Sequence, residues 1–379
     1  MTSRERMVLA MRNQMPDTVP VSPDISNMIP ARLTGKPFWD IYLYDDPPLW
    51  QAYIDAVCYF QMDGWYIYGG LRYLLKGDAR SLAAKTVSRT AERIVVRTTC
   101  CTPSGDLFWE DTYYLDNPPT PTSKWIKDPA RDIPIVLKHF FPPIVGYDDT
   151  EVKRRRSYLG EKGAFGLGID NLPGFHDLVW LFDGGLEAIS YAHVDYPDLF
   201  AELLEKQAEY EVRKAELALE VKPDFFMIGA SGLWTLSSPS IFRRFTLPTL
   251  QKITRMAKEA DIPSFLHSCG KARELAGICA NETDLSCINP LEVPPMGDCD
   301  LAEVKRSLGD RLALMGNLHT TDVMLRGTPE TVEEAALQAI QAAASGGGFI
   351  LSTGDQCGRD TPDENIRSLV RAARRYGKY

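Results

Sequence analysis

Two apolar runs of this sequence end in residues that can bind a metal ion together. The run PSFLHSC ends with His267 and Cys269, and Cys357 follows the later run GGFILST. Side chains at positions i and i+2 of a strand share a face, so His267 and Cys269 can approach one point. One imidazole and two thiolates suit zinc, and three protein ligands leave a fourth coordination position open for catalysis. The alternative is a buried histidine beside an ordinary core cysteine. The second cysteine at a matching strand end favours the metal site.

Composition and charge narrow the class of protein. The 379 residues carry a formal net charge of −9, which argues against a nucleic-acid partner because phosphate binding needs a cationic surface. No apolar stretch approaches the roughly 20 residues that span a bilayer. The segment MTSRERMVLAMRNQM is charged throughout, unlike a signal peptide, and Thr2 with Glu5 predicts a capping box at the start of a helix. We therefore expect a cytoplasmic protein with no membrane partner, in which the eight cysteines are reduced.

The elements that must position these residues alternate between short apolar runs and longer amphipathic stretches. The apolar runs predict strands near 18–25, 64–70, 163–169, 224–230, 263–269, 285–291, 311–317 and 347–353. The amphipathic stretches predict helices near 198–220, 240–260 and 329–345. This alternation indicates parallel strands joined by helices, and we predict an α/β protein with a (β/α)₈ TIM barrel and an N-terminal helical extension. A doubly wound sheet is the alternative, but no GxGxxG follows the first strand.

One region departs from this alternation. The segment ERIVVRTTCCTPSGDLFWEDTYYLD (92–116) has two β-rich runs around a turn at 103–106, which predicts a β-hairpin. We expect residues at about 80–145 to be an insertion in a single domain that spans residues 1–379. In a TIM barrel the active site lies at the carboxyl ends of the strands, where His267 and Cys357 are predicted.

Longer motifs resemble a known family. HSCG (267–270), MGNLHTTDVMLRGTPETVEE (315–334) and GGGFILSTGDQCGRDTPDENIRSLV (346–370) are similar to the uroporphyrinogen decarboxylase superfamily, and most similar to its zinc- and corrinoid-dependent methyltransferase branch. LSSPSIFRRFTLPTLQKI (236–253) also matches. The decarboxylases carry an Arg-Gln-Ala-Gly-Arg segment after the first strand, where this sequence has PDISNMIPARLTG. It therefore lacks the residues that hold the porphyrinogen carboxylates.

The resemblance implies a fold, two cofactors and a partner. It implies a TIM barrel in which His267, Cys269 and Cys357 bind Zn²⁺, and methyl transfer between a small molecule and the cobalt of a corrinoid. The sequence has no Asp-x-His-x-x-Gly cobalamin signature. We therefore expect the corrinoid (cobalamin) to be supplied by a separate small corrinoid protein.

Three further residues are candidates for catalysis. Glu292 follows a predicted strand, and it is either an exchangeable fourth zinc ligand or a solvated loop carboxylate. Asn317 and His319 follow the strand RLALMGN and are positioned to contact the substrate oxygen or the corrinoid. His319 is a departure, because the family usually has Asp there.

The choice of methyl donor depends on aromatic residues near predicted strand ends. We expect Tyr66, Asp170, Asn171 and Trp234 to bind substrate, within an aromatic-rich group that also includes Trp65, Tyr68 and Trp180. Such a pocket favours a planar aromatic methyl ether, so the methyl group would pass to Co(I) in an O-demethylation. The alternatives are a methyl-corrinoid:thiol methyltransferase, a decarboxylase of the porphyrinogen type and a non-enzymatic binding protein. Aromatic residues also commonly fill the barrel or the helix–barrel interface.

Overall fold

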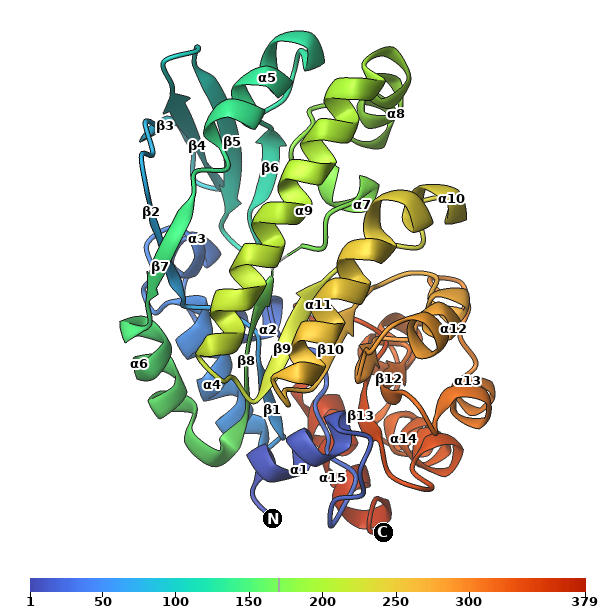
Figure 1. The fold of residues 1–379 in the computed structure, drawn as a ribbon. Coiled ribbons are helices and arrows are strands. Elements are labelled where there is room, and N and C mark those ends of the chain that lie inside the picture. Colours follow the sequence, from blue (N-terminus) through green and yellow to red (C-terminus); the bar gives the residue numbers. More distant parts are fainter. Residues whose placement is uncertain (170) are drawn as a thin grey trace.

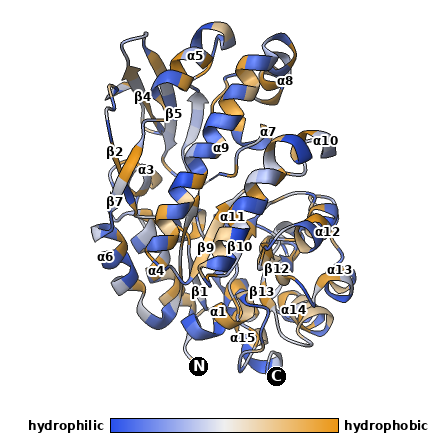
Figure 2. Ribbon diagram, in the orientation of Figure 1, coloured by the Kyte–Doolittle hydropathy of each residue, from blue (hydrophilic) through white to orange (hydrophobic). Residues whose placement is uncertain are grey.

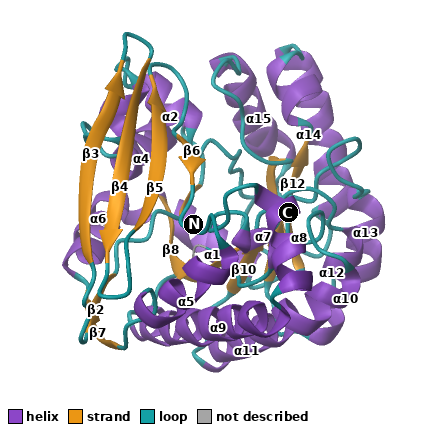
Figure 3. Cartoon of the chain, turned by 90° about the horizontal axis from the view of Figure 1, so that it is seen from above, coloured by secondary structure: helices purple, strands orange, loops and turns teal. Residues whose placement is uncertain are grey.

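A curled parallel sheet surrounded by helices forms the centre of the protein. The computed structural model describes residues 1–169 and 171–379. Within these residues, seven parallel strands pair in the order β1-β8-β9-β10-β11-β12-β13, and helices surround them (Figures 1 and 3). The strands are β1 (Gly64–Tyr66), β8 (Gly163–Ile169), β9 (Phe225–Gly229), β10 (Ser264–His267), β11 (Cys287–Asn289), β12 (Ala313–Leu318) and β13 (Phe349–Thr353). Sequential strands that are parallel neighbours require helical crossovers, as in a TIM barrel.

An extended segment before β1 occupies the eighth position of the ring. Val21 forms a parallel bridge with Leu351 of β13, and the N–H of Ser22 donates to the Leu351 carbonyl at 2.9 Å. On the other side, the N–H of Asp63, next to β1, donates to the Val21 carbonyl at 2.8 Å. The TIM-barrel prediction is confirmed. The strand predicted at 18–25 is reduced to this bridge because the prolines at 20 and 23 have no N–H to donate to a ladder.

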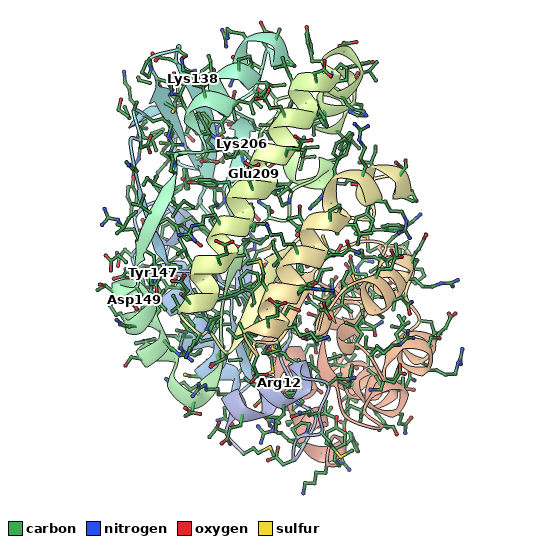
Figure 4. The ribbon with its side chains drawn as sticks, viewed as in Figure 1. Arg12, Lys138, Tyr147, Asp149, Lys206 and Glu209 are labelled. Atoms are coloured by element: carbon green, nitrogen blue, oxygen red, sulfur yellow. The ribbon has the colours of Figure 1, made fainter. Side chains whose placement is uncertain are left out.

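The helices follow the predicted amphipathic stretches. Thr2 and Glu5 form the predicted capping box, with Glu5 N–H donating to Thr2 Oγ1 at 3.2 Å and Thr2 N–H donating to Glu5 Oε2 at 2.8 Å. Charged pairs such as Lys206 and Glu209, 3.4 Å apart, lie on the outward side of α9 (Figure 4). The helices are α1 (Ser3–Met11), α2 (Met28–Leu33), α3 (Phe38–Tyr42), α4 (Leu49–Phe60), α5 (Pro129–His139), α6 (Thr150–Leu159), η1 (Gly160–Lys162), α7 (Phe175–Leu178), α8 (Gly185–Asp195), α9 (Pro197–Glu220), α10 (Pro239–Ile241), η2 (Phe242–Thr246), α11 (Leu247–Glu259), α12 (Arg273–Glu282), α13 (Leu301–Leu308), η3 (Thr320–Leu325), α14 (Pro329–Ala343) and α15 (Asp363–Tyr376).

A second, antiparallel sheet lies beside the barrel. The predicted hairpin is formed by β4 (Arg93–Cys101) and β5 (Leu107–Tyr114), and β3 (Ser81–Arg89) and β6 (Thr120–Ser123) extend it to four strands within residues 81–123. A short ribbon of β2 (Arg72–Leu75) and β7 (Ile144–Asp148) connects this sheet to the barrel (Figure 1). An apolar cluster that includes Leu107, Ile133 and Phe200 packs the sheet and α5 against α7–α9.

The apolar residues gather where the elements meet. The parallel strands are rich in apolar residues, whereas the surrounding helices carry mixed apolar and polar faces (Figure 2). Burial of these helix faces against the sheet is the main source of folding stability in such an architecture. In the described part of the chain, no helix combines the length and the apolar character that crossing a bilayer requires.

Candidate functional site

A cavity of about 220 Å³ opens at the carboxyl ends of the parallel strands. We call it the mouth cavity. Its walls come from the first extended segment, β1, β8, β9, β10 and the loop after β13. The lining residues are Asp24, Ser26, Trp65, Ile67, Gly69, Gly166, Leu167, Gly168, Ile169, Met227, Gly229, Ser231, His267 and Gln356. The cavity therefore lies where a TIM barrel carries its active site.

His267 is the last residue of β10, and its ring is oriented by two neighbours. Its Nδ1–H donates to Oδ1 of Asn289 at 3.0 Å. Burial lowers the pKa of His267, but a hydrogen bond with Cys269 and the negative charges of Asp355 and Asp24 outweigh that effect and raise the pKa to about 9. Histidines that bind a metal commonly donate the other ring N–H to an oxygen in this way.

Cys357 lies in the loop after β13 and is buried. Its backbone N–H donates to the Asp24 carbonyl at 2.8 Å. Burial, followed by the charge of Asp24, raises the pKa of the Cys357 thiol to about 12. All eight cysteines of the chain are described, and none is paired in a disulfide.

The three predicted zinc ligands lie in the same part of the molecule, but their side chains are not arranged as a metal-binding group. Among the residues that the structure describes, no three His, Cys, Asp or Glu side chains are grouped closely enough to hold a metal ion. His267 and Cys269 are in contact, and Asp24 is near enough to affect the pKa of both His267 and Cys357. The donor chemistry fits zinc, and the oxygen partner of His267 fits a metal ligand. The ligand set stays a prediction.

Glu292 lies beyond β11, and its side chain holds the turn after Cys269 by a hydrogen bond. Its Oε2 accepts a hydrogen bond from the backbone N–H of Gly270, whose φ of +87° favours glycine. Glu292 is buried, so it is not the solvated loop carboxylate that was the alternative. Burial raises the pKa of Glu292, and the hydrogen bond from Gly270 opposes that effect. Glu292 therefore links two loops beside the predicted metal ligands.

Asn317 and His319 line a different cavity, of about 620 Å³, between the end of β12 and the helices α13 and α14. Asn317 Nδ2 donates to the Leu291 carbonyl at 2.9 Å. His319 Nδ1 accepts from the backbone N–H groups of Thr321 at 3.1 Å and Asp322 at 3.0 Å, so the ring caps the start of η3. An aspartate side chain can accept the same bonds at a helix start, so the Asp that the family resemblance led us to expect here could fill the same capping role.

The predicted substrate-binding residues are dispersed. Tyr66 is buried on the side of β1 opposite Trp65 and Ile67, and it stacks on Phe165 with ring centroids 4.5 Å apart. Trp234 packs edge-on against Phe242, and Asn171 is half-buried just after β8. None of the three lines the mouth cavity. Asp170 lies outside the described residues.

Asp24 is an acidic residue of the mouth cavity that sequence reasoning missed. It is buried on the cavity wall, and burial, followed by the charge of Asp355, raises its pKa. The signal was present, because Asp24 is the acidic residue near the end of the first apolar run, TVPVSPDI. A buried acid at the carboxyl end of a barrel strand indicates a functional position.

Comparisons with known proteins identify relatives of this chain and of its fold. A family model described as uroporphyrinogen decarboxylase (URO-D) matches residues 183–376, which is just over half of the chain. The matched range contains the predicted zinc ligands, together with Glu292, Asn317 and His319.

Curated relatives include both decarboxylases and methyltransferases. The uroporphyrinogen decarboxylase of Coxiella burnetii is 26% identical over 185 residues, covering 48% of each chain. The methylcobamide:CoM methyltransferase MtaA of Methanosarcina barkeri is 30% identical over 182 residues, covering 47% of this chain and 50% of the relative. This chain thus spans about half the length of the curated relatives it matches. A solved methyltransferase from Methanosarcina mazei covers 99% of both chains with a TM-score of 0.66 and 19% identity, a likeness of fold.

Proposed function

Because this chain belongs to the uroporphyrinogen decarboxylase (URO-D) family, we propose that it is a zinc-dependent methyltransferase. It moves a methyl group from a methoxylated aromatic compound to the Co(I) corrinoid of a separate small corrinoid protein. The carbon–oxygen bond of the ether breaks, the methyl group joins cobalt, and the aryl oxygen keeps the electron pair and takes up a proton. The partner supplies the corrinoid because this sequence has no cobalamin signature.

The character of the mouth cavity is the observation that carries this proposal. Trp65, Ile67 and Met227 give it an aromatic and apolar wall beside His267. None of the described residues that line it is a lysine or an arginine. A neutral single-ring ether suits such a wall, because apolar burial supplies the affinity and no cation is needed.

Each residue of the proposed site has a distinct task. His267, Cys269 and Cys357 would hold zinc, which when bound supplies a Lewis acid for the ether oxygen. Asn289 keeps the Nδ1–H of His267 engaged and so presents Nε2. Glu292 serves as the exchangeable fourth ligand, and its bond to Gly270 positions the loop that carries Cys269. Asn317 and His319 shape the larger neighbouring cavity, where we place contact with the corrinoid protein.

A second candidate is transfer in the opposite direction, from a methyl-corrinoid to a thiol. The names of the Methanosarcina relatives favour it, since these are methylcobamide:CoM methyltransferases. Among the described residues that line the cavity, His267, a proposed zinc ligand, is the one basic side chain. An anionic thiol acceptor would therefore meet the Asp24 carboxyl group with no lysine or arginine beside it to offset the repulsion. The absence of lysine and arginine from the described lining also disfavours a porphyrinogen substrate, whose several carboxylates need cations.

The two directions are separated by supplying each set of reactants to the purified, zinc-loaded chain. In one reaction 2-methoxyphenol is mixed with cob(I)alamin, either free or held by a small corrinoid protein from the same organism. In the other, methylcobalamin is mixed with a simple thiol. We expect the cobalt spectrum to change to that of methylcobalamin in the first reaction. Loss of methylcobalamin in the second reaction alone would establish the thiol direction and overturn the proposal.

A further inference from the structure

The mouth cavity contains a carboxyl group of which one oxygen is engaged and the other is free. Oδ1 of Asp24 accepts hydrogen bonds from the backbone N–H of Ser26 at 2.9 Å and from its hydroxyl at 2.6 Å. No residue in the described part of the chain donates a hydrogen bond to Oδ2. Asp24 is 2% exposed and lines the cavity, so Oδ2 is an acceptor available to a bound molecule.

The backbone around Asp24 is fixed on both sides. Its N–H donates to Thr353 Oγ1 at 2.9 Å, and its carbonyl accepts from the Cys357 N–H at 2.8 Å. The hydroxyl of Tyr68 donates to the carbonyl of Ser26. The carboxyl group is therefore held in place before any ligand arrives, which lowers the entropic cost of a hydrogen bond to it.

We propose that the substrate is a methoxylated phenol with a free hydroxyl group, which donates its hydrogen bond to Oδ2 of Asp24. The inference rests on the proposed function and names the substrate class of the same site. Asp24 and His267 line one small cavity, so a single aromatic ring can place its hydroxyl against Asp24 and its methoxy group towards His267. Asp24 then determines the specificity of the site for a ring that carries a hydroxyl group.

This specificity comes from the free-energy cost of leaving Oδ2 of Asp24, a buried acceptor, without a hydrogen-bond partner. A ring that carries a methyl group in place of the hydroxyl expels water from Oδ2 and returns no hydrogen bond. Sites built to bind a hydroxyl group discriminate strongly against analogues that lack it. Trp65, Ile67 and Met227 contact either ring in the same way, so the discrimination comes from Asp24.

Binding measured by calorimetry tests this inference without a corrinoid. The ligands are 2-methoxyphenol and 2-methoxytoluene, which match in size and differ in the hydrogen-bond donor. The full chain should bind 2-methoxyphenol roughly tenfold more tightly, or better. Asp24→Ala should abolish the preference. Asp24→Asn keeps an oxygen for Ser26 but turns an N–H₂ group towards the cavity, so it should lower the preference while preserving the local fold.

The matched control is Asp310→Asn, an exposed carboxylate just before β12 at the opposite end of the strands, which should behave as the unmodified chain does. Equal affinity for the two ligands, binding of neither, or a preference that survives in both Asp24 variants would overturn the inference. Methyl transfer is scored separately. A preserved preference without any methyl transfer would contradict the proposed function and leave the hydroxyl-binding role of Asp24 standing.

Discussion

At the residue scale, the candidate site consists of side chains that are each oriented by a neighbour. Asn289 accepts from His267, Glu292 accepts from Gly270, and His319 caps the turn that follows it. Such contacts restrict the rings and carboxylates to a few positions before any metal or substrate binds. Preorganisation of this kind is what a metal site with an open coordination position requires.

The zinc content of single-residue variants should distinguish a zinc ligand from a residue that only lies beside the ligands. We expect about one zinc per unmodified chain, the stoichiometry of a three-ligand catalytic site. Glu292→Gln should keep most of the zinc, because the amide oxygen can still accept from Gly270 and the three other ligands remain, but its turnover should change. Cys357→Ser should lose zinc and activity together, because a hydroxyl is a poor soft ligand.

Metal analysis and rates measured side by side decide these outcomes. Absence of zinc from the reconstituted chain would contradict the ligand assignment. If Glu292→Gln matches the unmodified chain in both zinc content and rate, Glu292 only holds the turn after Cys269.

His176 gives a prediction about stability and pH. The ring is buried in α7, and burial lowers its pKa from 6.5 to about 3. Between these values the unfolded chain takes up a proton that the folded chain does not bind. The free energy of unfolding should therefore fall as the pH drops from about 6.5 towards 3, by up to about 1.4 kcal/mol per pH unit.

Chemical unfolding at pH 7 and pH 4.5 measures this contribution. His176→Phe cannot titrate, so its free energy of unfolding should fall less over that interval than the value for the unmodified chain. An equal fall in both proteins would show that His176 is not held neutral in the folded state.

The sequence predicted where the candidate site residues lie along the strands, but it did not predict which groups they contact. The ends of two apolar runs predict His267, Cys269 and Cys357 at or just past strand ends, and β10 ends at His267 while β13 ends at Thr353, four residues before Cys357. The partners of Glu292 and His319 are backbone N–H groups, whose positions depend on how loops fold and leave no pattern in side-chain type. Trp65 and Tyr66 were both expected near the substrate pocket, but side chains alternate along β1, so Trp65 lines the cavity and Tyr66 does not.

At the scale of elements, one buried carboxylate joins the parts that complete the barrel. Asp63 is fully buried before β1, and its Oδ2 accepts from the Val21 N–H of the extended segment at 2.9 Å. Its Oδ1 accepts from Arg6 Nη1 of α1 at 2.9 Å, and Arg374 Nη1 of α15 lies 3.0 Å from Oδ2. Asp63 thus ties the eighth position of the ring to both terminal helices.

Removal of this carboxylate should therefore be costly. Asp63→Ala should lower the free energy of unfolding by about 3–5 kcal/mol, because it leaves a largely buried arginine and a strand N–H without a partner. Asp17→Ala is the matched control. Asp17 pairs with the same Arg6 but is 41% exposed, so its loss should cost about 0–1 kcal/mol. Equal effects in denaturant titrations of the two variants would contradict the role given to Asp63.

Periodicity predicted the elements that are buried on at least one face. The parallel strands and the helices α9, α11 and α14 follow from their apolar patterns. The strand β3 (SLAAKTVSR) is exposed along its whole length, so burial imposed no alternation on its sequence. It therefore escaped prediction, and the insertion was expected to be a hairpin rather than a four-stranded sheet.

At the scale of the whole molecule, we propose that two proteins carry out separate tasks. This chain provides the barrel, the proposed zinc ligands and an apolar cavity that is sized for one ring. In the proposed function the corrinoid comes from a partner protein, which would have to bring cobalt to the mouth of the barrel. The chain alone should therefore bind substrate and leave the ether intact.

Transfer of a labelled methyl group tests whether this chain needs a corrinoid protein to demethylate the ether. 2-Methoxyphenol with a ¹³C-labelled methyl group is incubated with the zinc-loaded chain, with and without a reduced small corrinoid protein, and the label is followed by NMR. We expect the label to appear on cobalt, with an equal amount of catechol, only when both proteins are present. Release of catechol by this chain with no corrinoid present, or a label that stays on the ether when both proteins are supplied, would contradict it.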